Sequence, residues 1–79
     1  MSKTEIFEIV ARNTRDVIPT LGSHPIALND SLRALGANSL DRSEIVIMTL
    51  EALQLSLPLA TTARAQNIDE LVNLLHASL

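Results

Sequence analysis

Few side chains in this sequence could take part in chemistry, and most of them stand alone. The two histidines, His24 and His76, are far apart, and His76 near the end of an expected helix is explained by the favourable interaction of a cation with the helix dipole. Without cysteine the chain has no thiolate nucleophile, disulfide or zinc site. Gly22 and Gly36 are the only glycines, so there is no glycine-rich phosphate loop, and no carboxylate pair has a recognisable catalytic context. The sequence predicts a protein that is not an enzyme and holds no metal.

One serine stands where a phosphate ester would be stabilised. Ser39 directly follows Asn38, a good N-cap for a helix that begins at residue 38 or 39. Its side chain should project outward at the first helical position, where free backbone amides and the positive end of the helix dipole favour an anion. The simpler interpretation is that Ser39 is only another capping hydroxyl, and the local pattern leaves both open.

Three longer helices and one short helix are expected to position these residues. Capping patterns mark the start of the first and the last, formed by Ser2 with Glu5 and by Asn67 with Glu70. Helical spacing of apolar residues predicts helices over about 3–16, 38 or 39–53, 60–64 (a weak signal) and 68–77. No stretch alternates as a strand would. The predicted fold is all-α, a small helical bundle that forms one domain over residues 1–79.

The long segment between the first two helices, residues 19–38, carries glycine, proline and several turn-forming polar residues. Loops of this length tend to be functional. Its apolar residues should hold it against the core: Ile26, Leu28, Leu32 and Leu35. Residues 32–35 could form a single helical turn that ends at Gly36.

The second helix is expected to have two different faces. At 100° per residue, the inward face collects Ile45, Val46, Thr49, Leu50 and Leu53. The opposite face collects Leu40, Glu44, Ile47, Met48 and Glu51. Asp41 falls at the third helical position, where a carboxylate favours the positive helix end. The outer face mixes carboxylates with aliphatic residues, which is unusual for a plain solvated surface.

Composition excludes several kinds of partner. Six Lys and Arg against nine Asp and Glu give a formal net charge of −3, and Phe7 is the single aromatic residue, so nucleic acid is not expected. The longest apolar run, residues 45–48, is far shorter than the roughly 20 residues that cross a bilayer. The N-terminus lacks the pattern of a secretory signal. A cytoplasmic, monomeric protein without membrane contact is expected.

One stretch, together with the helix layout, resembles a known family. The sequence Leu35-Gly36-Ala37-Asn38-Ser39-Leu40-Asp41 is similar to the phosphopantetheine attachment motif of acyl carrier proteins. The resemblance extends over nearly the whole chain and includes the long loop, Glu44, Leu57-Pro58 and residues 67–71. A second triplet, Asp30-Ser31-Leu32, also matches the motif in part. However, the family serine follows the motif glycine by three positions, as Ser39 does.

The resemblance implies carriage and not catalysis. A phosphopantetheinyl transferase would use coenzyme A and Mg²⁺ to attach 4′-phosphopantetheine to Ser39, and the thiol of that arm would hold an acyl group as a thioester. Carriers of this kind dock through an acidic second helix. The resemblance therefore implies partner-binding by Leu40, Asp41, Arg42, Glu44, Ile47, Met48 and Glu51. A loosely covered edge of the core is the other interpretation of the aliphatic residues in this set.

Details of the motif depart from the usual pattern of fatty-acid carriers. Asn38 replaces the usual aspartate, Arg42 adds a positive charge, and residues 59–63 contain no acid. The run from Gly36 to Ile45 looks more like the donor carriers of polyketide β-branching cassettes. Such carriers receive malonyl through an acyltransferase, a ketosynthase-like decarboxylase converts it to acetyl, and a hydroxymethylglutaryl (HMG) synthase-like enzyme takes the acetyl. The alternatives are a general polyketide or fatty-acid carrier and, in another class, an unmodified helical adaptor.

Overall fold

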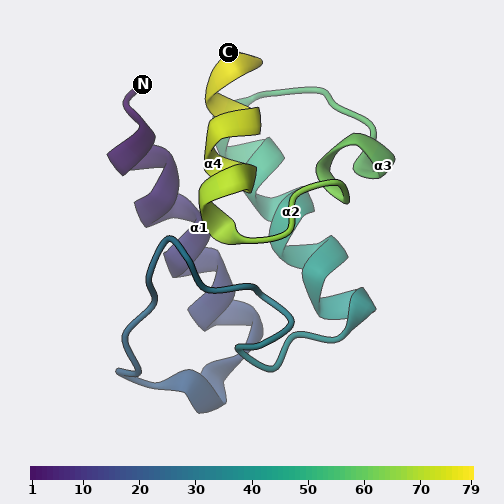
Figure 1. Cartoon of the computed structure of the whole chain (residues 1–79). Coiled ribbons are helices and arrows are strands. Elements are labelled where there is room, and N and C mark those ends of the chain that lie inside the picture. The colour runs from purple at the N-terminus through teal and green to yellow at the C-terminus, as the bar shows by residue number, and fades with distance from the viewer.

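The computed structural model describes all residues from 1 to 79, and it is built from helices alone (Figure 1). In chain order they are α1 (Lys3–Val17), the 3₁₀ turn η1 (Pro19–Leu21), α2 (Ser39–Leu53), α3 (Leu59–Thr62) and α4 (Ile68–Ala77). The predicted all-α class is confirmed. The short helix differs from the prediction, since it begins one residue earlier and ends two residues sooner. None of the helices combines the length and apolar character that a bilayer crossing requires.

The three longer helices enclose the core. α1 packs against both α2 and α4, while α3 lies at the edge beside α2 (Figure 1). The hydrophobic core cluster is formed by Ile6, Val10, Val46, Leu50, Leu53, Ile68, Leu71, Val72 and Leu75. All five residues predicted for the inward face of α2 are buried. The 3.6-residue period therefore predicted the buried face of α2 correctly.

Side chains cap the helices largely as predicted. At the start of α1, Ser2 Oγ accepts a hydrogen bond from the Glu5 amide at 3.1 Å, and Glu5 Oε1 accepts one from the Ser2 amide at 2.9 Å. These hydrogen bonds lower the pKa of the Glu5 carboxyl. The stabilisation that the ionised Glu5 adds is therefore complete above the pKa of an ordinary glutamate, and it is lost as the pH falls through the lowered pKa. In α4 only Asn67 acts as expected, because Glu70 Oε1 accepts from the Gln66 amide instead.

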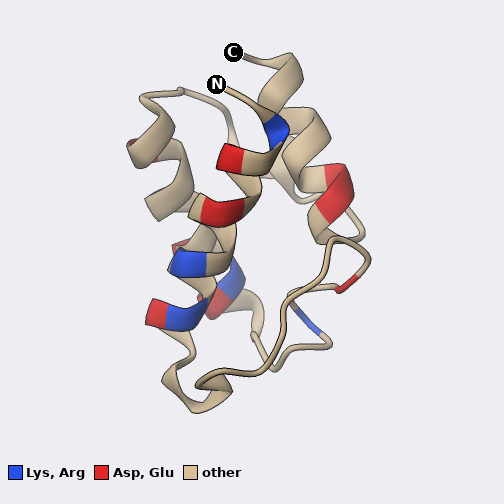
Figure 2. Cartoon of the chain, turned by 90° about the vertical axis from the view of Figure 1, so that its left-hand side faces the viewer, with Lys and Arg blue, Asp and Glu red and all other residues tan.

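Charges are distributed differently on α1 and on α4. Figure 2 shows acidic and basic residues mixed along α1, whereas the first turn of α4 carries two acids, Asp69 and Glu70. Two carboxylates at a helix N-terminus interact favourably with the helix dipole. The mixed charges leave α1 without a continuous surface of one sign.

A buried polar pair fixes α1 against α2. Asn13 Nδ2 donates to Thr49 Oγ1 at 3.0 Å, and Thr49 Oγ1 donates to the Ile45 carbonyl at 2.8 Å. Both residues are almost fully buried. Since no buried side-chain nitrogen or oxygen lacks a partner, this pair adds specificity to the helix register without an unpaired group.

We expect Asn13→Ala to destabilise the protein by about 1–2 kcal/mol, because it removes a buried hydrogen bond and leaves an underfilled site. Chemical denaturation followed by circular dichroism measures the change. Asn73→Ala, at an exposed position of α4, is the matched control and should stay within about 0.5 kcal/mol of the parent chain. Equal effects of the two substitutions would show that the pair does not link the helices.

The loop after η1 is held by its backbone as well as by its side chains. Ile26, Leu32 and Leu35 pack against the core as predicted, but Leu28 is 45% exposed, so that part of the prediction is wrong. A turn explains the difference, because the Asp30 amide bonds to the Ala27 carbonyl and Asp30 Oδ2 accepts from the Ala27 amide. Leu28 contributes its carbonyl instead, which accepts from the Asp69 amide at 2.8 Å.

A single helical turn brings the loop to the start of α2. The Leu35 amide donates to the Ser31 carbonyl at 3.1 Å, and the Ala37 amide donates to the Leu32 carbonyl at 3.0 Å. Gly36 ends the turn with a φ of +105°, a conformation that glycine adopts readily and other residues do not. The predicted turn is confirmed, and it places Asn38 where α2 must begin.

Candidate attachment site

Ser39 is the first residue of α2, and its side chain is exposed. Asn38 supplies the cap: its Oδ1 accepts from the Asp41 amide at 2.8 Å, and Asp41 Oδ2 accepts from the Asn38 amide at 3.1 Å. The Ser39 hydroxyl is therefore not needed to begin the helix. The interpretation of Ser39 as the capping hydroxyl is wrong, and the capping role belongs to its neighbour.

The surroundings of Ser39 suit a phosphate ester. The amides at the start of an α-helix have no carbonyl partner within the helix, and the cap here satisfies the amide of Asp41. The amides of Ser39 and Leu40 precede that position and lie beside the hydroxyl. Together with the helix dipole they favour an anion bonded to Ser39 Oγ.

Ser31 is engaged in a different way. It is half-buried, and its Oγ accepts a hydrogen bond from the Ala34 amide at 3.0 Å. It therefore caps the turn that ends at Gly36. Of the two serines in motif-like triplets, Ser39 is the one whose hydroxyl is exposed and has no capping role.

The histidines offer no catalytic arrangement. Both are exposed; His24 Nδ1 lies 2.8 Å from the Pro25 carbonyl oxygen, and His76 lies in the last turn of α4. No group of three His, Cys, Asp or Glu side chains comes together as a metal site. What the site around Ser39 offers is an exposed hydroxyl that another protein can modify.

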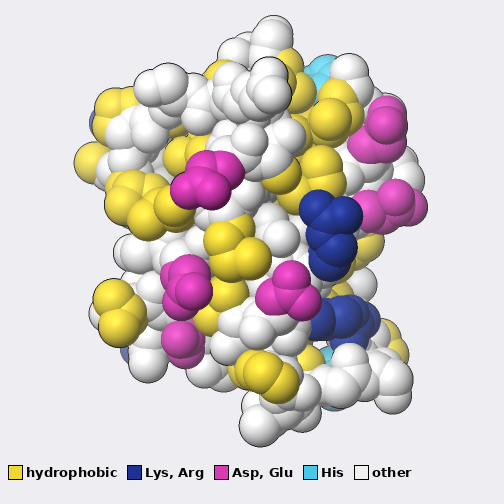
Figure 3. Space-filling model, turned by 180° about the vertical axis from the view of Figure 1, so that it is seen from behind, with side chains coloured by type: hydrophobic (Ala, Val, Ile, Leu, Met, Phe, Trp, Pro, Cys, Tyr) yellow, Lys and Arg dark blue, Asp and Glu magenta, His cyan; other side chains and the backbone are white.

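Most of the predicted docking residues share the outer face of α2. Leu40 is 77% exposed and Ile47 42%, and Glu44 and Glu51 are exposed beside them, while Met48 is half-buried. Figure 3 shows carboxylates and apolar side chains interleaved over this side of the molecule, with basic side chains gathered to the right of its centre. Their role in partner binding stays a prediction.

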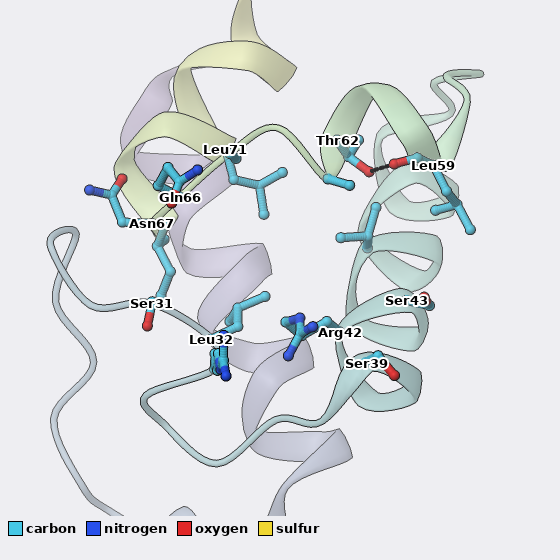
Figure 4. A pocket seen from close by; sticks show the side chains of 15 residues that line it. Ser31, Leu32, Ser39, Arg42, Ser43, Leu59, Thr62, Gln66, Asn67 and Leu71 are labelled. Atoms are coloured by element: carbon cyan, nitrogen blue, oxygen red, sulfur yellow. Dashed lines mark hydrogen bonds between the residues drawn. The ribbon is translucent and has the colours of Figure 1, made fainter.

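Two predicted docking residues do not point freely outward. Asp41 is half-buried and holds the cap through Oδ2. Arg42 is also half-buried, and its Nη1 donates to the Ala37 carbonyl at 3.0 Å. Figure 4 shows the Arg42 side chain directed into a groove between α2 and the loop. The sequence contained only part of this signal: Arg42 precedes the buried Val46 by four residues, which places its Cβ atom on the same side of the helix but does not fix where the guanidinium points.

One exposed apolar residue near this face was missed. Leu59, the first residue of α3, is 40% exposed, and together with Ile47 it lines a shallow depression of about 350 Å³. The short third helix gave too weak a pattern for the face of Leu59 to be predicted. Leu59 extends the apolar surface of α2 across to α3.

Comparison with known proteins agrees with this geometry. A family model described as a phosphopantetheine attachment site matches residues 5–75. The chain belongs to the acyl carrier protein family. The carrier is thus not an enzyme, and its cofactor is covalently attached 4′-phosphopantetheine.

Two relatives match almost the whole carrier. It is 41% identical over 76 residues to the polyketide biosynthesis acyl-carrier-protein AcpK of Bacillus subtilis (strain 168), covering 96% of this chain and 93% of the relative. It also resembles a chain in the crystal structure of the curacin biosynthetic pathway HMG synthase in complex with an acetyl donor acyl carrier protein. That match has a TM-score of 0.92 and 40% identity, and covers 98% of this chain and 99% of the other.

Proposed function

We propose that Ser39 is the attachment residue and that residues 1–79 act as one carrier domain in the cytoplasm. The observation that carries this proposal is the exposed Ser39 hydroxyl at the start of α2, released from capping by Asn38. A phosphopantetheinyl transferase would join Ser39 Oγ to the 4′-phosphopantetheine of coenzyme A. The new bond is a phosphodiester, and adenosine 3′,5′-bisphosphate is the leaving group.

The chain and the arm have separate tasks in this mechanism. The arm supplies a thiol, which holds the acyl group as a thioester; the chain has no cysteine of its own. The chain presents the hydroxyl on a rigid helix, holds the phosphodiester near free backbone amides, and offers α2 to partner enzymes. The transferase provides the base that activates the hydroxyl, which explains why no histidine is placed beside Ser39.

We further propose that the carrier is an acetyl donor in polyketide β-branching. It would receive malonyl, present it to a ketosynthase-like decarboxylase, and deliver the resulting acetyl group to an HMG synthase-like enzyme. Two features support this function: the run from Gly36 to Ile45, and the likeness to both a polyketide carrier and a donor carrier bound to an HMG synthase. A general polyketide or fatty-acid carrier is the alternative within the family.

Loading and transfer assays test the two levels of the proposal separately. The purified chain is first incubated with coenzyme A and a promiscuous transferase, and intact mass should show the gain of one phosphopantetheine. No gain would favour the unmodified adaptor. The acetyl form is then mixed with an HMG synthase-like enzyme and an acceptor carrier that bears a β-ketoacyl group. Failure of acetyl transfer would remove the β-branching role and leave the general carrier.

We expect Glu44→Lys to slow association with such a partner several-fold in dilute buffer, with a smaller effect at high salt. Opposite charges on two proteins accelerate their encounter, and this attraction is screened by ions. Glu8→Lys makes the same change on α1 and serves as the control, since Glu8 is also exposed. Stopped-flow association rates measure both. Equal slowing by the two variants would indicate a net-charge effect and argue against α2 as the docking helix.

A further inference from the structure

A groove of about 450 Å³ lies next to the attachment helix (Figure 4). Its walls come from the loop at residues 31–33, from α2, from α3 and the segment after it, and from the start of α4. Leu32, Val46 and Leu71 contribute apolar surface. Two arginines, Arg33 and Arg42, are the only charged residues that line it. A carrier with a net charge of −3 therefore has a groove whose ionisable side chains are all positive.

Arg42 is placed to bind an anion in this groove. Figure 4 shows its side chain extending into the space between α2 and Leu32. One of its N–H groups donates to the Ala37 carbonyl, which anchors the guanidinium. A guanidinium has further N–H donors in a planar fork that matches the two oxygens of a carboxylate. Because the side chain is half-buried, an ion pair here is less screened by solvent than one on the surface.

We infer that this groove binds the free carboxylate of a dicarboxylic acyl group, such as malonyl, carried at the end of the arm. The inference rests on the proposed attachment at Ser39. Figure 4 shows the Ser39 side chain pointing away from Arg42. The phosphodiester bonded to Ser39 Oγ therefore does not face the guanidinium. The far end of the flexible arm is better placed, because it can fold back into the groove and reach Arg42. A short flexible tether gives an effective concentration in the millimolar range, so weak affinity is sufficient for substantial occupancy.

This site distinguishes the acyl group before decarboxylation from the group after it. Loss of CO₂ breaks the bond to the carboxylate carbon, and protonation of the remaining carbanion leaves an uncharged acetyl thioester. The acetyl group has no anion for Arg42 and is released to a partner. A long alkyl chain would have to displace water from the guanidinium without pairing it, which is unfavourable. The groove thus favours short acyl groups that bear a carboxylate.

NMR of the chain in four states tests this site: unmodified, with the free arm, with acetyl and with malonyl. We expect malonyl alone to shift the Arg42 Nε–Hε signal and the amides of Leu32, Thr62 and Leu71 beyond the positions seen with the free arm. Equal shifts with acetyl and malonyl would overturn the inference, because the carboxylate would then add nothing. If Ser39 is not an attachment site, the result is seen at an earlier step, because the chain then gains no mass when the modified forms are prepared.

Two charge-removing variants complete the test. In Arg42→Gln the malonyl form should lose the malonyl-specific shifts and give the acetyl pattern. Arg12→Gln, on the exposed side of α1, removes the same charge and should keep them. Amide signal dispersion checks that both variants are folded. Malonyl-specific shifts that persist in Arg42→Gln would overturn the assignment of Arg42.

Discussion

Replacing Ser39 with alanine should abolish attachment of phosphopantetheine and leave the stability of the protein within about 0.5 kcal/mol of the parent chain. Attachment needs the Ser39 oxygen as nucleophile, whereas the fold does not. Asn38 and Asp41 cap α2 through each other, and the Ser39 side chain is exposed. Intact mass after incubation with a transferase and coenzyme A measures attachment, and thermal unfolding measures stability.

Ser31→Ala provides the matched control for this experiment. Ser31 Oγ accepts a hydrogen bond from the Ala34 amide, so we expect a stability loss of about 1 kcal/mol with attachment retained. The two variants should therefore show opposite patterns, one losing modification and the other stability. A mass gain in Ser39→Ala that disappears in Ser31→Ala would move the attachment site to the other triplet.

Helix positions could be predicted because local physics determines them. The capping residues Ser2, Asn38 and Asn67 mark three helix starts, and each of them accepts the hydrogen bond expected of an N-cap. The inward face of α2 follows from the 3.6-residue period, since every apolar side chain on it can reach the core. The glycine that ends the turn before α2 was predictable for a similar reason, because few residues adopt its φ.

The less predictable features depend on contacts between distant segments. The exposure of Leu28 follows from a turn whose carbonyl groups bond to the start of α4, about 40 residues later in the chain. The direction of Arg42 depends on the groove that the loop and α3 create beside it. A helical period places the Cβ atom of such a residue but not the head of a long side chain, which can turn toward either side. The outer face of α2, with Glu44 and Glu51, was therefore predicted better than the groove that Arg33 and Arg42 line.

Gly36→Val is expected to have the second large effect, a loss of about 1–3 kcal/mol in the free energy of unfolding. The cause is conformational and not steric. A Cβ atom at Gly36 would meet no atom within 4 Å, but the φ of +105° is unfavourable for any L-residue and most of all for a β-branched one. For a domain of this size the loss corresponds to a fall in Tm of roughly 4–8 °C per kcal/mol.

Ala34→Val adds a valine to the same turn and serves as the control. Ala34 is exposed and is not among the residues with positive φ, so its replacement should change the Tm little. The two valines should also differ in their effect on modification. The turn ends at Gly36, three residues before Ser39, and strain released by unwinding it would displace Asn38 from the cap of α2. We therefore expect the transferase to modify Gly36→Val more slowly than Ala34→Val at a temperature where both are folded. Equal rates would show that the start of α2 forms independently of the turn before it.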